Sequence, residues 1–154
     1  MQTIGGLEVS ALGPGDVPAM RALTRVLGEA FEDLETYARA PASDAYLERI
    51  LARDELVVLA ATKDGEIVGG LVAYELVKIE RERSEIYIYD LAVAAAHRRQ
   101  GVATALIREA QRIAAARGAW VVYVQADLGD APAIALYTKL GVREDVLHFD
   151  IPVR

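Results

Sequence analysis

The chain alternates between stretches whose hydrophobic spacing suits strands and stretches whose spacing suits helices. Short apolar runs bounded by glycine, proline or polar turn residues predict strands, and apolar residues three or four positions apart predict helices. The expected strands cover residues 7–12, 56–62, 67–77, 84–93, 120–126 and 145–151. The expected helices cover residues 16–30, 43–52, 101–117 and 131–140. This order, β-α-α-β-β-β-α-β-α-β, predicts a single α+β domain over residues 1–154, built around one mixed sheet.

Turn residues and strand composition refine this picture. Asp64-Gly65 lies between two β-rich runs and predicts a hairpin that joins them. Residues 78–83 are mostly charged and are expected to form the solvated loop after the second of these strands. The next strand, residues 84–93, is apolar or aromatic on both faces toward its end, which is typical of a central, buried strand.

The residue types that usually carry nucleophilic or metal chemistry are nearly absent. The chain has no cysteine, two histidines (His97 and His148) and three serines. A disulfide framework, a thiolate zinc site and a cysteine nucleophile are therefore excluded. So few histidines and serines make a Ser-His-Asp triad or a multi-histidine metal centre improbable, and we expect no bound metal.

The charge balance points to a cationic partner. The chain has 23 acidic and 17 basic residues, for a formal net charge of −6, which disfavours nucleic acid and anionic membranes as partners. Its longest aliphatic runs have six residues, whereas crossing a bilayer takes roughly 20. No secretory signal is recognisable at the amino terminus, and we expect a cytoplasmic protein. Four acids (Glu29, Glu32, Asp33 and Glu35) are either a solvated helix end or a wall for a cationic substrate.

The most informative segment is the basic turn between the strand 84–93 and the helix that follows it. Arg98-Arg99-Gln100-Gly101-Val102-Ala103 opens the helix, so several backbone N–H groups and the positive end of the helix point at one place. Gly101 allows a positive φ or the close approach of a ligand. The turn lacks the ending of a Walker loop and the three glycines of a dinucleotide fingerprint. It therefore predicts an anion site built mainly from the main chain.

In this setting the turn resembles the Q/R-x-x-G-x-G/A signature of the GNAT superfamily of N-acetyltransferases. Residues 130–142 are similar to a second pattern of that superfamily, N-x-A-A-x-x-L-Y-x-K-x-G-F. More narrowly, the stretches SEIYIYDLAV, HRRQGVATALI, ALYTKLG and HFDI resemble aminoglycoside 3-N-acetyltransferases of the gentamicin-acetylating type. The resemblance implies a fold with splayed central strands, a homodimer, and acetyl-CoA-dependent acetylation of an aminoglycoside at its 3-amino group, which confers antibiotic resistance.

The resemblance also implies where the cosubstrate acetyl-CoA binds. The backbone of the strand end would pair with the pantetheine arm, the basic turn would take the pyrophosphate, and the thioester would lie between the splayed strands 87–93 and 121–127. Asp130 replaces the usual asparagine, so it either lies near the cofactor or caps the helix 131–140. The expected cofactor-binding residues are Leu91, Ala92, Val93, Arg98, Arg99, Gln100, Gly101, Val102, Ala103, Thr104, Asp130, Ala133 and Tyr137.

Direct transfer from a thioester to an amine needs a carboxylate to take the amine's proton and an acid near the sulfur. Tyr137 corresponds to the family tyrosine that faces the sulfur of CoA. The candidates for the base are Asp90, Asp127 and Glu85, and Asp127 is also a candidate for binding the substrate's ammonium groups. Asp90 interrupts an apolar strand, where a buried carboxylate is costly unless it is used or paired.

Which face of this strand lines the cleft stays open at the level of sequence. The family carries a bulge in this strand, and a bulge breaks the alternation, so either Asp90 or the Tyr87/Tyr89 face could look into the cleft. The expected substrate-binding residues are Asp33, Glu85, Tyr87, Tyr89, Asp127 and Asp150. His148 is expected to be a packing or edge residue of the last strand. The alternatives to an aminoglycoside are another small polyamine, a peptide amine, or a non-catalytic module that binds acetyl-CoA.

Overall fold

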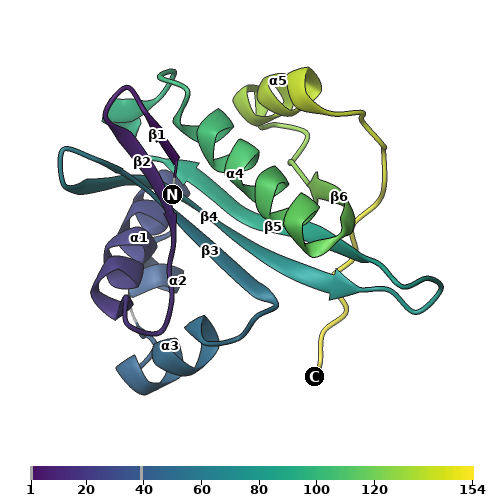
Figure 1. Ribbon diagram of the computed structural model, residues 1–154, viewed down its shortest axis with the longest axis horizontal. Coiled ribbons are helices and arrows are strands. Elements are labelled where there is room, and N and C mark those ends of the chain that lie inside the picture. The colour runs from purple at the N-terminus through teal and green to yellow at the C-terminus, as the bar shows by residue number, and fades with distance from the viewer. Residues whose placement is uncertain (1, 39) are drawn as a thin grey trace.

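The structure, a computed structural model, describes residues 2–38 and 40–154; residues 1 and 39 of the expected domain lie outside this part. One six-stranded sheet runs in the order β1-β2-β3-β4-β5-β6 (Figure 1). All neighbouring strands are antiparallel except β5 and β6, which are parallel. The strands are β1 (Gln2–Ile4), β2 (Leu7–Ala11), β3 (Leu56–Lys63), β4 (Glu66–Val77), β5 (Ser84–Val93) and β6 (Ala119–Val124). The helices are α1 (Val17–Ala30), α2 (Leu34–Ala38), α3 (Asp44–Leu51), α4 (Val102–Arg117) and α5 (Ala131–Leu140), with a 3-10 turn at Ala95–His97.

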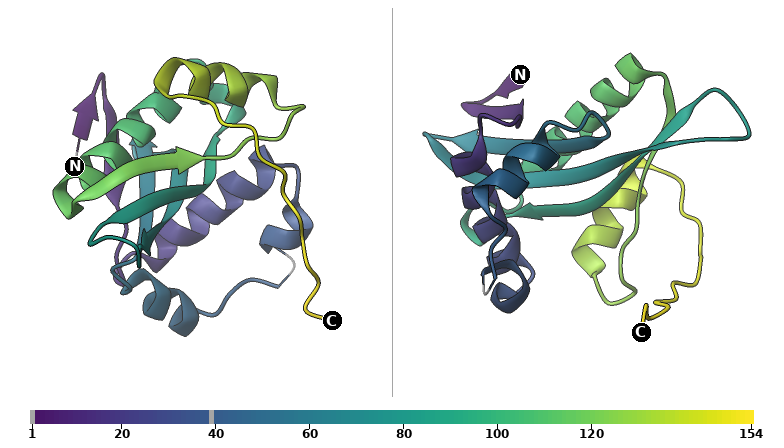
Figure 2. Two further views of the ribbon diagram at one scale, coloured as in Figure 1. Left: turned by 90° about the vertical axis from the view of Figure 1, so that its right-hand side faces the viewer. Right: turned by 90° about the horizontal axis from the view of Figure 1, so that it is seen from below.

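Helices cover both faces of the sheet, and each face has its own core. The views in Figures 1 and 2 place α1, α2 and α3 on one side and α4 and α5 on the other. Alternating residues of β3 and β4 divide between the two: Leu59 and Leu71 pack in the core under α4, while Val58 and Val72 pack in the core under α1. The expected α+β class with one mixed sheet is confirmed.

Local signals explain most element ends. The hydroxyl of Ser43 accepts a hydrogen bond from the backbone N–H of Tyr46 at 3.2 Å and caps α3 as expected. Gly118, at φ +74°, ends α4. Asp64 and Gly65 both have positive φ at the β3–β4 hairpin turn, as two-residue hairpin turns require. Asp16 precedes α1, but its carboxylate accepts from the N–H of Gly13 at 2.7 Å instead of capping the helix.

The expected strand over residues 145–151 is wrong. Residues 142–154 run as an extended chain with no ladder partner among the described strands, and Leu147, Phe149 and Ile151 are 83%, 76% and 85% exposed. Alternation in the sequence shows how side chains would face if a strand formed, but a strand is stable only beside a neighbour. Two short elements were also missed: β1, which forms a hairpin with β2, and α2.

Gly70 lets α1 lie directly on the sheet, and we expect Gly70→Ala to destabilise the fold. A Cβ there would stand 2.1 Å from Cδ1 of Leu23 and 2.9 Å from the backbone oxygen of Leu59. Leu23 could move, but the backbone of β3 could not without disturbing the sheet. Overpacking of this kind costs about 1–3 kcal/mol, which lowers Tm by roughly 2–12 °C in a domain of this size. The control is Gly15→Ala, where a Cβ meets nothing within 4 Å and Tm should stay unchanged in a thermal melt.

Candidate active site

The two central parallel strands separate partway along their length. The β5–β6 ladder runs from the pair Ser84 and Ala119 to the pair Ile88 and Val124, where β6 ends. Beyond this point β5 continues to Val93 and pairs only with β4 among the described strands. The backbone of Leu91–Val93 therefore has one side that no strand of the described chain covers. The family resemblance implies that the pantetheine arm binds at this strand end.

A bulge in β5 decides which side chains face the α1 side of the sheet. Ala73 of β4 lies opposite Ile88, whereas Val72 lies opposite Asp90, so Tyr89 is an extra residue. Before the bulge Ile88 points into the core under α4, and after it Ala92 points into the core under α1. Asp90 therefore lies on the same face of the sheet as Tyr87. The two alternatives that the sequence leaves open, Asp90 and the face with Tyr87, do not exclude each other.

Four tyrosines gather beside Asp90 on this face. Tyr87 stacks on Tyr123 with ring centroids 4.7 Å apart, and Tyr89 meets both Tyr87 and Tyr74 edge to face at about 6 Å. The hydroxyl of Tyr87 donates to the side-chain oxygen of Gln125 at 2.9 Å. The result is an aromatic surface next to one carboxylate, which suits a cationic group because the faces of aromatic rings attract cations.

Asp90 is bonded to Tyr37, a residue 53 positions earlier in the chain. The Tyr37 hydroxyl donates to Oδ1 of Asp90 at 3.3 Å. Burial raises the pKa of Asp90, and the hydrogen bond from Tyr37 opposes this effect. Burial first, and then the charge of Asp90, raise the pKa of Tyr37 to about 12, so Tyr37 stays a hydrogen-bond donor. Its side chain was not among the expected site residues, because the sequence gives no sign of this long-range contact.

The turn before α4 has an unusual backbone. Arg99 and Gly101 have φ values of +61° and +82°, and a left-handed arginine is uncommon outside constrained sites. Gly101 opens α4 without a side-chain cap, so the first N–H groups of the helix point out of the turn. Arg98 donates from Nε to the carbonyl of Val93 at 3.3 Å, and Lys63 donates to the side-chain oxygen of Gln100 at 3.4 Å. Both contacts hold the turn against the ends of β3 and β5.

The other expected cofactor residues contribute in different ways. Val102 is buried in the core under α4, so only its backbone is available, while Ala103 and Thr104 are half-buried in the first turn of the helix. Asp130 caps α5: its Oδ1 accepts from the N–H of Ala133 at 3.2 Å. Of the two alternatives for Asp130, this contact matches the cap, and it also occupies the N–H of Ala133.

Tyr137 lies on α5 and packs against the core under α4. Burial, and then the nearby charge of Asp130, raise the pKa of its phenol. The group is therefore protonated at neutral pH and can donate a proton. Its position on α5 puts it on the opposite side of the sheet from Asp90.

The remaining expected acids do not all gather at this place. Asp33 accepts from the N–H of Thr36 at 3.2 Å and lies close enough to Tyr37 to contribute to its raised pKa. Glu85 lies near the start of β5 and is paired with Lys78 at 2.6 Å. Asp127 is exposed just beyond β6. Asp150 is also exposed, and its carboxylate contacts His148 at 2.8 Å in the extended terminal residues.

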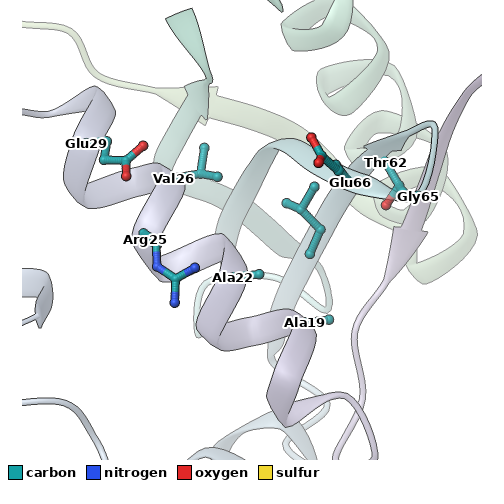
Figure 3. A pocket seen from close by; sticks show the side chains of 9 residues that line it. Ala19, Ala22, Arg25, Val26, Glu29, Thr62, Gly65 and Glu66 are labelled. Carbon is teal, nitrogen blue, oxygen red and sulfur yellow. The ribbon is translucent and has the colours of Figure 1, made fainter.

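An open groove of about 540 Å³ lies elsewhere, between α1 and the β3–β4 turn. Figure 3 shows Arg25 and Glu29 on the helix side and Thr62 and Glu66 on the sheet side. The groove shares Glu29 with the four acids that the sequence places either at a solvated helix end or in a wall for a cationic substrate, and it holds none of the expected cofactor-binding residues. Its lining is Ala19, Ala22, Arg25, Val26, Glu29, Thr62, Gly65, Glu66 and Ile67.

Two searches of the described residues gave negative results. Residues 2–38 and 40–154 hold no group of three or more His, Asp or Glu side chains placed to bind a metal ion. No helix in the same part of the chain combines the length and the apolar character needed to span a membrane.

Comparison with known proteins identifies the class to which this fold and turn belong. The model of the acetyltransferase (GNAT) family matches residues 21–142. The chain therefore belongs to the acetyltransferase (GNAT) family, whose members transfer acetyl groups from acetyl-CoA without a metal. The search of curated proteins finds no match.

Solved structures of aminoglycoside acetyltransferases are similar over nearly the whole chain. HMB0005, from an uncultured soil metagenomic sample, is 59% identical, with a TM-score of 0.94 over 96% of this chain and 99% of that chain. A second protein, meta-AAC0020, also from an uncultured soil metagenomic sample, is 29% identical. Its complex with trehalose has a TM-score of 0.90 over 99% of this chain and 100% of that chain. Its complex with sisomicin has a TM-score of 0.89 over 97% of each chain.

Proposed function

We propose that the protein catalyses acetyl-CoA-dependent acetylation of an aminoglycoside antibiotic at its 3-amino group, and so confers resistance. The observation that carries this proposal is the position of Asp90. The bulge places this carboxylate on a tyrosine-lined face at the point where β5 loses β6. Similarity to HMB0005 and to meta-AAC0020, which was solved with sisomicin, supports an aminoglycoside as the acceptor.

The residues around the β5–β6 gap fit acetyl-CoA. When bound, acetyl-CoA supplies the thioester whose acetyl group is transferred. The uncovered backbone of Leu91–Val93 can add an extended chain by main-chain hydrogen bonds. In the turn from Arg98 to Thr104, Gly101 opens α4 without a side-chain cap, so the turn presents the first N–H groups of a helix N-terminus, where phosphate groups bind well. The positive φ of Gly101 sets the direction in which the N–H groups at the start of α4 point.

Asp90 is proposed as the base. An ammonium group cannot attack a carbonyl carbon, so the acceptor amine must first lose a proton, directly or through a water molecule. A carboxylate whose pKa is raised by burial is a better proton acceptor than a solvated one. Tyr37 holds Asp90 in place by its hydrogen bond. Glu85 is a poorer candidate, because Lys78 neutralises it.

Tyr137 is proposed as the acid. Attack of the amine on the thioester breaks the carbon–sulfur bond and leaves a thiolate, which needs a proton or a strong hydrogen bond. The raised pKa of Tyr137 keeps its phenol protonated. Because base and acid lie on opposite sides of the sheet, one proton can leave the nitrogen while another reaches the sulfur.

The acceptor side suits a molecule with several ammonium groups. Asp33 and Asp90 lie around Tyr37, and the exposed Asp127 follows β6. Carboxylates bind ammonium groups by charge-assisted hydrogen bonds, and the faces of Tyr87 and Tyr89 add attraction for cations. This combination favours a polycationic acceptor over a peptide with a single amino-terminal amine.

We expect Gly101→Ala to weaken acetyl-CoA binding selectively. A Cβ at φ +82° strains the turn and rotates the N–H groups that open α4. The KM for acetyl-CoA should rise on the order of tenfold, as loss of one good hydrogen bond would cause, while the KM for the aminoglycoside stays within twofold. Gly118→Ala is the matched control: it strains the other end of the same helix at φ +74°, so it should lower Tm similarly and leave KM unchanged. Equal effects of both variants on KM would contradict a phosphate site at Gly101.

The proposed function is tested by following thiol release from acetyl-CoA with gentamicin, spermidine and an amino-terminal peptide. We expect kcat/KM for gentamicin to exceed the other two by at least 100-fold. A higher kcat/KM for spermidine or for the peptide would show that the acceptor is another amine and not an aminoglycoside. Binding of acetyl-CoA without turnover of any amine would favour a non-catalytic module. Cytoplasmic location stays a prediction from the sequence.

A further inference from the structure

The short helix α2 reaches the base across the face of the sheet that α1 covers (Figures 1 and 2). Within residues 2–38 and 40–154, the Tyr37 hydroxyl is the one side-chain group that is hydrogen-bonded to Asp90. It donates to Oδ1 at 3.3 Å, which is longer than the roughly 2.7–2.8 Å typical of O–H···O bonds. The bond therefore has room to shorten, and it leaves Oδ2 of Asp90 for an acceptor amine.

Close packing on α1 determines where α2 holds the ring of Tyr37. Gly28 is buried in α1, and a Cβ there would stand 3.0 Å from Cβ of Tyr37. The carbonyl of Gly28 also accepts from the backbone N–H of Asp33 at 3.0 Å. The ring of Tyr37 packs against the core under α1, and this core contains Val72, which lies opposite Asp90 in the β4–β5 ladder. A glycine at position 28 thus brings a tyrosine of α2 to the base.

A second carboxylate, Asp33, acts on the same phenol. Asp33 precedes α2: its Oδ1 accepts from the N–H of Thr36 at 3.2 Å, and its carbonyl accepts from the N–H of Tyr37 at 3.3 Å. After burial and the contact with Asp90, the charge of Asp33 also raises the pKa of Tyr37. The pKa of Asp90 itself is shifted by burial and by the bond from Tyr37, and Asp33 is not among the causes. Any influence of Asp33 on the base therefore passes through Tyr37.

No cation of the described chain offsets these two carboxylates. The ion pairs within residues 2–38 and 40–154 all lie elsewhere. The residues that α1 contributes to the core on which Tyr37 packs are apolar. The other titratable groups beside Asp90 are the phenols of Tyr74 on β4 and of Tyr87 and Tyr89 on β5, and burial raises the pKa of Tyr74 and Tyr87. A positive charge next to Asp33 is therefore supplied by a ligand.

We propose that Tyr37 is a positioning residue that transmits the charge of a second ammonium group of the acceptor, bound at Asp33, to the base Asp90. This inference rests on the proposed function, because it takes Asp33 as part of the acceptor site. An ammonium group at Asp33 offsets one of the two charges that oppose ionisation of the phenol, so the phenol becomes a stronger hydrogen-bond donor. Its bond to Oδ1 then shortens, as hydrogen bonds of active-site groups often do when substrate binds. Tyr37 keeps its own proton, while Oδ2 of Asp90 receives the proton of the reacting amine.

The link defines the class of acceptor that the site uses best. One amine reacts beside Asp90 while a second ammonium group occupies Asp33, so the acceptor must carry at least two such groups. An acceptor with a single amine leaves the charge of Asp33 in place. With such an acceptor the bond from Tyr37 stays long, and Asp90 takes up a proton from water at a higher pH.

Carbon-13 NMR of the ligand-free protein tests the link without any assumption about activity. The carboxyl carbon of Asp90, assigned with Asp90→Asn, is titrated in wild type, Tyr37→Phe, Asp33→Asn and the double variant. Tyr37→Phe should raise the pKa of Asp90 by about one unit, since a hydrogen bond to the ionised form is lost. Asp33→Asn can still accept from the N–H of Thr36, and it should lower the pKa of Asp90 when Tyr37 is present. It should cause no shift in the Tyr37→Phe background.

Three results of this titration would overturn the proposal. They are an unchanged pKa of Asp90 in Tyr37→Phe, an unchanged pKa in Asp33→Asn, and a shift by Asp33→Asn that persists in the double variant. The matched control is Tyr74→Phe, which removes a hydroxyl on the same face that is not bonded to Asp90, and it should leave the pKa of Asp90 unchanged.

Gly28→Ala tests the geometry without altering either carboxylate or the phenol. The added methyl group would displace Tyr37 by a few tenths of an ångström, and a bond that is already 3.3 Å long does not survive such a displacement. The pKa of Asp90 should therefore rise, as it does in Tyr37→Phe. An unshifted pKa in Gly28→Ala, or an equal rise in Tyr74→Phe, would contradict the position and role assigned to Tyr37.

Steady-state kinetics with gentamicin separate positioning of the base from a purely structural effect. In Tyr37→Phe the acid limb of the kcat/KM profile should move to higher pH by about one unit, while kcat at pH 9 and the KM for acetyl-CoA stay within threefold of wild type. A loss of the same size at every pH would show a structural effect and overturn the proposal. If the wild type acetylates no aminoglycoside, the proposed function fails, while the NMR titration still decides whether Tyr37 links Asp33 to Asp90.

Discussion

Asp90→Asn is expected to lower kcat with an aminoglycoside by about 10²–10⁴-fold, the usual contribution of a general base. The asparagine keeps the shape of Asp90 and can still accept the hydrogen bond from Tyr37, so the site should stay in place while the amine keeps its proton. The acid limb of the kcat/KM profile against pH, which reports ionisation of the base, should disappear in the variant. Steady-state kinetics from pH 5 to 9 measure both effects.

The same variant should not be less stable than wild type at neutral pH. Burial raises the pKa of Asp90, so the folded state favours the protonated carboxyl. The stability gained from this preference is complete below about 3.9, the ordinary pKa of an aspartate, and is lost as pH rises through the higher folded value. At pH 7 Asp90→Asn removes a charge that the fold tolerates poorly, so its Tm should equal or exceed that of wild type.

Two controls separate Asp90 from the other candidates for the base. Glu85→Gln removes a carboxylate that is paired with Lys78, and Asp127→Asn removes an exposed one. We expect Glu85→Gln to leave the pH profile unchanged and Asp127→Asn to raise mainly the KM for the aminoglycoside. If Asp127→Asn abolished the acid limb while Asp90→Asn did not, Asp127 would be the base.

Tyr137→Phe is expected to lower kcat by about 10²–10⁴-fold, because the leaving thiolate loses its proton donor. The ring should still pack against the core under α4, so acetyl-CoA should bind within threefold of wild type in calorimetry. Tyr46→Phe removes a hydroxyl on α3, which lies on the opposite side of the sheet from α5 and Tyr137 (Figures 1 and 2), and should change neither value. An equal loss of turnover and of acetyl-CoA affinity would show that Tyr137 binds the cofactor instead of acting as the acid.

Strong local signals allowed the centre of the fold to be predicted from the sequence. Asp64-Gly65 fixed the β3–β4 hairpin, since both residues adopt the positive φ that such a turn needs. Ser43 marked the start of α3 by its side-chain cap. Gly101 and Gly118 bounded α4 because both take left-handed conformations. Each of these signals acts within a few residues, so the sequence carries it directly.

Features that depend on distant parts of the chain could not be predicted in the same way. The bulge at Tyr89 shifts Asp90 to the α1 side, and hydrophobic period alone does not locate an extra residue. The bond between Tyr37 and Asp90 joins positions 53 residues apart. The alternation of residues 145–151 predicts a strand, but the structure has none there, because a side-chain pattern does not say whether a neighbouring edge is present to pair with it.

Acetylation at the 3-amino group is tested most directly by the structure of the product formed from sisomicin and acetyl-CoA. We expect one monoacetylated product by mass spectrometry, formed with one thiol released per acetyl group, and NMR should place the acetyl on the 3-amino nitrogen. Turnover of no aminoglycoside, or an acetyl group on a different nitrogen, would contradict acetylation at the 3-amino group.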